Sequence, residues 1–96
     1  MLTRDEILRA LKGSKSIFFQ KYPLKSMGLF GSFARNEGTA KSDVDVLVEF
    51  SQPVGFEIVD LALDLEQLLG YRVDVVSKKG LKATLLPYVE KDLIYV

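Results

Sequence analysis

The stretch GSFARNEGTAKSDVDVLVEF, residues 31–50, decides how this chain folds. It opens with a glycine-serine pair, and an apolar strand that carries Asp43 and Asp45 begins after ten intervening residues. Side chains on a strand alternate between its two faces, so both carboxylates point to the same side. The pattern predicts a turn that can accept a phosphate group, placed just ahead of two acids on one face of a strand.

A third acid, Asp74, lies in the run YRVDVV at residues 71–76, where it interrupts a series of valines. If this second strand pairs beside residues 43–50, Asp74 joins Asp43 and Asp45 in one cluster. Carboxylates this close repel one another strongly unless a cation neutralises them. We therefore expect all three to be metal ligands and catalytic residues, with Asp74 able to accept the proton of an attacking hydroxyl.

The composition narrows the choice of metal. The chain has no cysteine and no histidine, so thiolate and imidazole ligands are excluded and hard oxygen ligands remain. Such ligands suit Mg²⁺, Mn²⁺ or Ca²⁺ far better than Zn²⁺ or copper. We expect two Mg²⁺ ions, with Mn²⁺ as the alternative, that position a triphosphate and offset the charge on the departing pyrophosphate.

The glycine-serine turn fits the phosphates of a nucleotide. Gly31 lets the backbone approach phosphate oxygens closely, the Ser32 hydroxyl can donate a hydrogen bond, and a short helix that starts here presents free N–H groups. Arg35 and Ser42 are expected to add contacts to the phosphates. Three of these residues also have a simpler interpretation: Gly31 ends a strand, Ser32 caps a helix, and Arg35 is a surface cation.

The chain as a whole reads as one small domain, residues 1–96, with a single modest core. Helical and extended patterns alternate along it. We expect helices at about 4–21, 32–35 and 58–69 and around Pro87, and strands at 26–30, 43–50, 72–77 and 93–96. A break at Gly13 is the alternative for the first helix. This order predicts an α+β fold in which a small mixed sheet is packed with helices.

Charge and hydropathy argue against two classes of partner. The 13 basic residues cancel the 13 acidic ones, so no overall field attracts nucleic acid, and no direct nucleic-acid binding is expected. The N-terminus is charged, and no stretch approaches the ~20 apolar residues of a membrane span. We therefore expect a soluble cytoplasmic protein that binds no membrane.

The two central motifs carry a family resemblance. LFGSFAR at residues 29–35, followed by SDVDVLV at residues 42–48, resembles the signature of the DNA polymerase β-type nucleotidyltransferase superfamily, and the small size is similar to that of its minimal nucleotidyltransferases. The resemblance implies that the glycine-serine turn holds nucleotide phosphates and that the three acids bind two Mg²⁺ ions. One departure is Asn36, where relatives often have glycine; asparagine tolerates a left-handed backbone, so the turn is expected to survive.

The resemblance also implies a partner. Minimal members are similar to antitoxins encoded beside a helical HEPN-type ribonuclease toxin, which implies transfer of AMP from ATP to a tyrosine of that toxin. This leading hypothesis is a Mg²⁺-dependent nucleotidyltransferase that acts as an antitoxin. Two alternatives stay open: a module that neutralises a partner by docking alone, with the acids vestigial or merely nucleotide-binding, and a transferase that acts on a small molecule.

Overall fold

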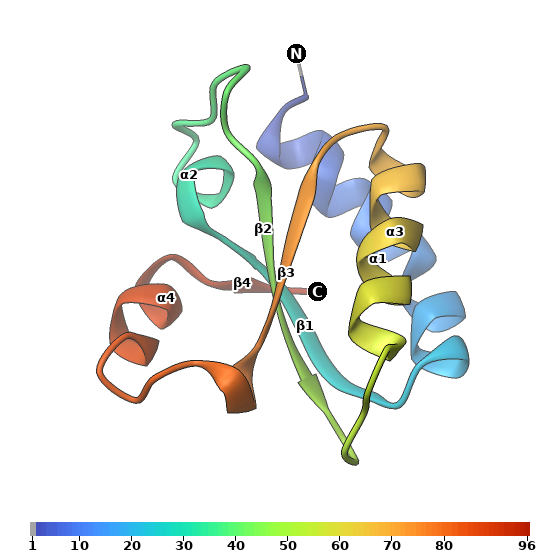
Figure 1. Ribbon diagram of the computed structural model, residues 1–96. Coiled ribbons are helices and arrows are strands. Elements are labelled where there is room, and N and C mark those ends of the chain that lie inside the picture. The colour runs from blue at the N-terminus through green and yellow to red at the C-terminus, as the bar shows by residue number, and fades with distance from the viewer. Residues whose placement is uncertain (1) are drawn as a thin grey trace.

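The computed structural model describes residues 2–96, and within them a four-stranded sheet is packed with helices (Figure 1). The elements in chain order are α1 (Arg4–Lys21), β1 (Leu24–Phe30), α2 (Gly31–Ala34), β2 (Val44–Phe50), α3 (Glu57–Leu69), β3 (Val73–Ser77), the 3-10 turn η1 (Lys78–Gly80), α4 (Leu86–Asp92) and β4 (Ile94–Tyr95). This arrangement confirms the predicted α+β fold with a small mixed sheet. No helix in this part of the chain is both long and apolar enough to cross a membrane.

The sheet has the order β3-β2-β1-β4. Strands β2 and β3 run parallel, whereas β1 is antiparallel to both of its neighbours, β2 and β4. The register pairs Asp45 of β2 with Asp74 of β3 on one side and with Phe30 of β1 on the other. The end of β1 and the beginnings of β2 and β3 therefore meet at one edge of the sheet, and the expected pairing of the two acid-bearing strands is confirmed.

The hydrophobic core lies between the sheet and the two long helices. In Figure 1, α1 and α3 cover one face of the sheet, while α2 and α4 lie on the other side. Three valines of β2, Val44, Val46 and Val48, are fully buried in the core cluster. The two long helices add buried side chains to the same cluster: Ile7, Leu11 and Phe18 from α1, and Leu61 and Leu65 from α3. Because side chains alternate along a strand, Asp45 points away from this layer.

Helix α1 has the predicted limits and is continuous. It begins after a capping box in which Thr3 and Glu6 exchange hydrogen bonds of 3.2 and 3.0 Å with each other's backbone N–H groups. The alternative of a break at Gly13 is wrong, since the helix runs through that position. A mid-helix glycine costs about 1 kcal/mol relative to alanine, whereas each buried apolar side chain on the core side contributes about 1.5–3 kcal/mol. Packing therefore outweighs the local penalty.

All four strands begin at a residue other than the predicted one: β3 begins at Val73 rather than Arg72, and β4 covers Ile94–Tyr95 rather than residues 93–96. Strand β1 begins at Leu24 rather than Ser26, because Leu24 already pairs with Phe50 across a bulge. Strand β2 begins at Val44 rather than Asp43. Asp43 thus lies one residue before the strand, on the loop that leads into the sheet. Its position is therefore not fixed by the hydrogen bonds of the sheet.

Candidate active site

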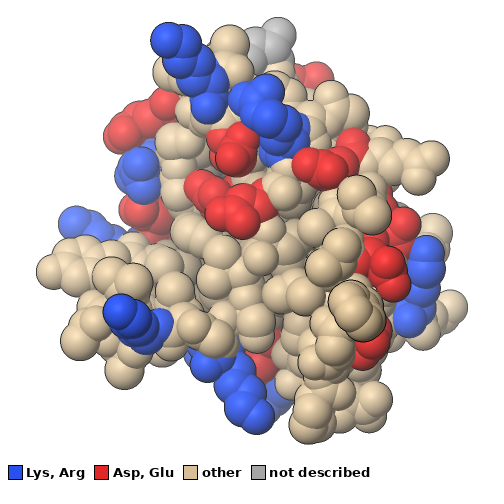
Figure 2. All heavy atoms as spheres, in the orientation of Figure 1, with Lys and Arg blue, Asp and Glu red and all other residues tan. Residues whose placement is uncertain are grey.

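The candidate site lies at the sheet edge where β1 ends and β2 and β3 begin. Gly31 follows β1 directly as the first residue of α2, and Asp45 and Asp74 are neighbours across the parallel strands. Residues opposite each other in a parallel pair project to the same face, so the two carboxylates lie on one surface. Acidic side chains gather over this upper part of the molecule in Figure 2.

Gly31 has two features that only glycine permits. Its φ of +77° lies in the left-handed region, where other residues are strained. A Cβ atom at this position would overlap the carboxylate of Asp45. The backbone at Gly31 and the Asp45 carboxylate therefore lie too close together for any residue other than glycine at position 31. A glycine that only ended the strand would not need such a close approach.

Ser32 lies inside α2 rather than at its cap. The residue at the N-cap is Phe30, and it makes no side-chain hydrogen bond to the helix, so the interpretation of Ser32 as a cap is wrong. Within residues 2–96 the Ser32 hydroxyl makes no hydrogen bond. The first turn of a helix also leaves N–H groups without intrahelical acceptors. This turn therefore retains donors for an anionic group.

The electrostatics of Asp45 favour a cation. The pKa of this carboxyl is raised to about 6, mainly by burial and then by the negative charges of Asp74 and Asp43, while the charge of Arg35 lowers it. A raised pKa means that the negative form is insufficiently compensated by the protein itself. The oxygen ligands present are those that Mg²⁺ or Mn²⁺ prefers, so the residues fit the metal that the family implies.

Asp43 is oriented differently from the other two acids. It is exposed, and its Oδ1 accepts a hydrogen bond of 2.8 Å from Nε of Arg72. In the described chain no three acidic side chains are grouped as a ready-made metal cage. Strand register brings Asp45 and Asp74 together, whereas the ion pair with Arg72 draws one oxygen of Asp43 away. Metal binding by all three residues stays a prediction.

Arg35 and Ser42 make contacts that the sequence did not predict. The Arg35 guanidinium lies 2.8 Å from a carboxylate oxygen of Asp92 in α4 and 3.4 Å from one of Glu37. It still lies close enough to Asp45 to lower the pKa of that carboxyl. The Ser42 hydroxyl accepts a hydrogen bond of 3.0 Å from the Thr39 N–H and so closes a turn of the loop. Both contacts stabilise the loop, and phosphate binding by either residue stays a prediction.

The loop between α2 and β2 contains the expected turn at Asn36. Its φ is +63°, the left-handed conformation that asparagine tolerates, so the departure from the family pattern leaves the turn intact. Phe33 is 2% exposed and belongs to the core.

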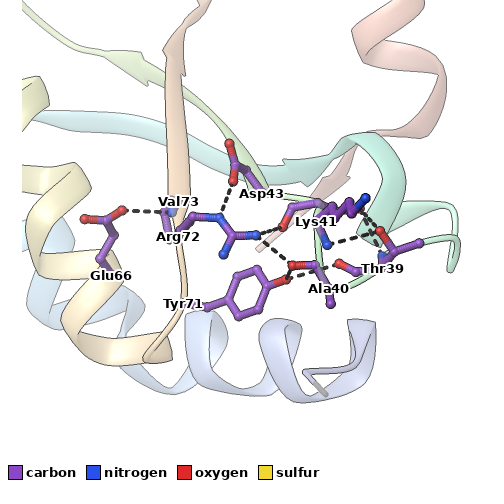
Figure 3. A network of polar contacts seen from close by, with 9 residues as sticks. Thr39, Ala40, Lys41, Asp43, Glu66, Tyr71, Arg72 and Val73 are labelled. Atoms are coloured by element: carbon purple, nitrogen blue, oxygen red, sulfur yellow. Dashed lines mark hydrogen bonds and ion pairs between the residues drawn. The ribbon is translucent and has the colours of Figure 1, made fainter.

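Sequence reasoning missed Tyr71 and Arg72, which immediately precede β3. Figure 3 shows both reaching across to the loop that carries Asp43. The available signal was a cation and a hydrogen-bonding aromatic residue just ahead of Asp74, in a segment interpreted only as a strand.

Comparison with known proteins agrees with this geometry. A family described as the nucleotidyltransferase domain matches residues 11–96. The chain is 38% identical over 97 residues to protein adenylyltransferase MntA of Thermococcus cleftensis, with 100% of this chain and 98% of that protein covered. It is also 44% identical over 103 residues to a Methanocaldococcus jannaschii protein named provisionally as a protein adenylyltransferase, with both chains fully covered.

Solved structures show the same fold. A structure described provisionally as a minimal nucleotidyltransferase superposes with a TM-score of 0.84 at 32% identity, covering 97% of this chain and 95% of that one. An MNT antitoxin in complex with the tri-AMPylated HEPN toxin of Shewanella oneidensis superposes with a TM-score of 0.60 at 20% identity, covering 96% of this chain and 66% of that one. At that identity the second likeness shows the fold alone.

Proposed function

Because the chain belongs to the nucleotidyltransferase domain family, as one of its minimal members, we propose that it moves AMP from ATP onto a hydroxyl group of a partner protein. The observation that carries the proposal is the pairing of Asp45 with Asp74 beside the left-handed Gly31. Paired carboxylates next to a backbone turn with free donors suit a reaction in which a triphosphate is held, attacked and cleaved.

Each residue of the site has a part in this reaction. The Gly31 backbone and the Ser32 hydroxyl orient the phosphates of ATP. Asp45, Asp74 and Asp43 would hold Mg²⁺, or Mn²⁺, which supplies positive charge against the triphosphate when bound. The acceptor oxygen attacks the α-phosphorus, the bond to pyrophosphate breaks, and Asp74 takes the hydroxyl proton. Asp74 suits this role because it is exposed on β3, where an acceptor from another molecule can reach it.

The acceptor we favour is a tyrosine of a HEPN-type toxin. Two similar proteins support this choice: one bears the name protein adenylyltransferase, and the other is an antitoxin of this fold in complex with an AMPylated HEPN toxin. A further structure of the fold, 22% identical with a TM-score of 0.71, holds the ATP analogue AMP-PNP in a toxin-antitoxin complex. The protein would then act as an antitoxin in the cytoplasm, where ATP and its partner are available.

The shape of the site favours a macromolecular acceptor over a small molecule. A cavity of about 820 Å³ lies beside Phe50, Ile58 and Leu86, at the far end of β2 from the acids. Small-molecule sites are usually clefts or cavities of about 300–1,000 Å³. None of the three acids lines this cavity, and Asp74 and Asp43 are exposed at the sheet edge. An open site suits a side chain presented by another protein.

The test supplies the purified chain with labelled ATP, Mg²⁺ and a HEPN-type toxin protein. Label on a tyrosine of the HEPN protein, absent with Asp45→Asn, is the expected result. Label on the HEPN protein with the variant as with the wild type would overturn the assignment of the site. Circular dichroism of the variant verifies that it is folded.

A second candidate, neutralisation by docking alone, is favoured by one observation. Helix α3 and the residue before it expose Phe56, Val59 and Leu63, with 83%, 53% and 58% of their surfaces accessible. An unpartnered apolar stripe of this kind is typical of a protein-binding surface. If Asp45→Asn forms a stable unlabelled complex that still silences the toxin, docking is the function and transfer is not.

A further inference from the structure

Arg72 makes three hydrogen bonds to the loop that leads into β2. Its Nε donates to Oδ1 of Asp43 at 2.8 Å, and its Nη2 donates to the carbonyls of Ala40 and Ser42, both at 3.0 Å. Figure 3 shows the guanidinium lying between Asp43 and the backbone of this loop. The side chain of Arg72, just before β3, thus contacts both Asp43 and the turn at residues 39–42 that precedes it.

Tyr71 supports Arg72 from below the loop. Its hydroxyl lies 3.1 Å from the carbonyl of Thr39 and 3.2 Å from that of Ala40. The Arg72 guanidinium stacks over the Tyr71 ring at 4.9 Å, and the same ring meets Phe33 edge to face at 5.6 Å. Since Phe33 is buried in the core, the contact connects the loop to the rigid part of the molecule.

Besides these contacts, the loop is held by the ion pair of Arg35 with Asp92 at its beginning and by the hydrogen bond from the Thr39 N–H to the Ser42 hydroxyl, and neither of these contacts involves Asp43. Residues 35–43 are mostly polar and exposed. Ladder pairing begins only at Val44, whose N–H donates to the Arg72 carbonyl at 2.9 Å. Asp43 therefore sits one residue before the sheet, where its direction depends on side-chain contacts. Among residues 2–96 its second oxygen, Oδ2, receives no hydrogen bond.

We propose that Arg72, supported by Tyr71, is a positioning residue that fixes the direction of Asp43 and the closed form of the 39–42 loop before metal or nucleotide binds. The guanidinium presents donors in a fixed planar fork, so it can bond a carboxylate and two carbonyls at once, which a lysine cannot do. By holding Oδ1 it leaves Oδ2 for a cation shared with Asp45 and Asp74. The catalytic consequence rests on the proposed function, whereas the ordering of the loop does not.

The first test measures hydrogen exchange of the whole protein without metal, nucleotide or partner. Arg72→Met is expected to speed exchange of the amides at residues 39–43 about tenfold, and Tyr71→Phe to speed it less, while exchange in α1 and α3 stays as in the wild type. Arg9→Met, which removes an exposed arginine of α1, is the matched control and is expected to change nothing in the loop. Unchanged exchange at residues 39–43 in Arg72→Met would overturn the proposal.

The second test uses Mn²⁺ as the probe and follows its binding by electron paramagnetic resonance. A positioning role predicts about tenfold weaker binding in Arg72→Met, because outer-shell partners of metal ligands commonly have effects of this size. Arg72→Lys keeps the charge and loses the fork, so it is expected to bind as weakly as Arg72→Met. If Arg72 acted only as a repelling cation, Arg72→Met would bind Mn²⁺ more tightly, and that result would contradict the proposal.

The two proposals can fail separately. If the wild type transfers no AMP, the proposed function fails, while the exchange measurement still decides whether Arg72 orders the loop. If transfer proceeds and Arg72→Met lowers kcat without faster exchange or weaker Mn²⁺ binding, the positioning role fails and the function stands. A thermal melt of each variant identifies any general loss of structure.

Discussion

Val46 and Asp45 are adjacent on β2, yet they belong to two different regions of the molecule. Val46 is fully buried under α1 and α3, whereas Asp45 faces the other side among carboxylates, with its pKa raised to about 6. The buried face stabilises the fold, whereas the acidic face brings together carboxylates that repel one another and do not stabilise the fold. Because side chains alternate along β2, the residues that stabilise the fold and the residues of the candidate site lie on opposite faces of this strand. We therefore expect substitutions on the buried face to change mainly stability and substitutions on the acidic face to change mainly AMP transfer.

The sharpest test of this separation is Asp45→Asn, for which we expect the largest effect. The amide keeps the shape of the carboxylate but cannot supply its charge to a metal, so AMP transfer is expected to fall about 10³-fold or more. Stability should be kept or raised near neutral pH, because a repelled carboxylate is removed. Transfer of label from ATP and urea unfolding measure the two quantities, and a variant that transfers normally would contradict the metal role of Asp45.

The next prediction concerns Gly31, the turn residue where β1 ends and α2 begins, which packs against the Asp45 carboxylate. Gly31→Ala places a methyl group against the Asp45 carboxylate at a φ of +77°, so both stability and transfer are expected to fall. Gly70→Ala is the matched control: its φ is +62°, but a Cβ there meets no atom within 4 Å. The control should lose about 1–2 kcal/mol of stability, the cost of a Cβ in the left-handed region, and no transfer.

The difference between the two glycine variants isolates the contact with Asp45. Conformational strain is common to both, so it cancels in the comparison. Equal loss of transfer in Gly31→Ala and Gly70→Ala would mean that the close approach of α2 to the acid has no role in the reaction.

On the buried face, Val46→Ala is expected to lower the free energy of unfolding by about 2 kcal/mol, because it removes buried methyl groups and leaves a cavity. Below the melting transition the folded fraction should still transfer AMP at close to the wild-type rate. Urea unfolding and an assay at low temperature measure these outcomes. A loss of transfer that exceeds the loss of folded protein would show that the two faces are coupled.

The sequence predicted the parts of the site that depend on backbone pattern. Strand alternation put Asp45 on the face opposite the valines, and the glycine at position 31 indicated a special turn. The interrupted valine run marked Asp74 as a third acid of the cluster on the condition that its strand pairs beside β2, which the structure shows. The partners of Asp43 and Arg35 could not be predicted in this way. Arg72 and Asp92 lie 29 and 57 residues from them, so these ion pairs depend on tertiary packing that no local pattern encodes.

The smallest expected effect is the pH dependence of stability that Asp45 contributes. Its pKa is about 6 in the folded protein, above the ordinary value of 3.8, so the folded state binds the proton more tightly than the unfolded chain. The stabilising effect of that proton is complete below about pH 4 and is lost as the pH rises through about 6. Other acids titrate in the same range, so the measurement is the difference in unfolding free energy between wild type and Asp45→Asn at each pH. The wild type should lose stability relative to the variant from pH 4 to 7, and a constant difference would mean that the acidic face carries no excess repulsion.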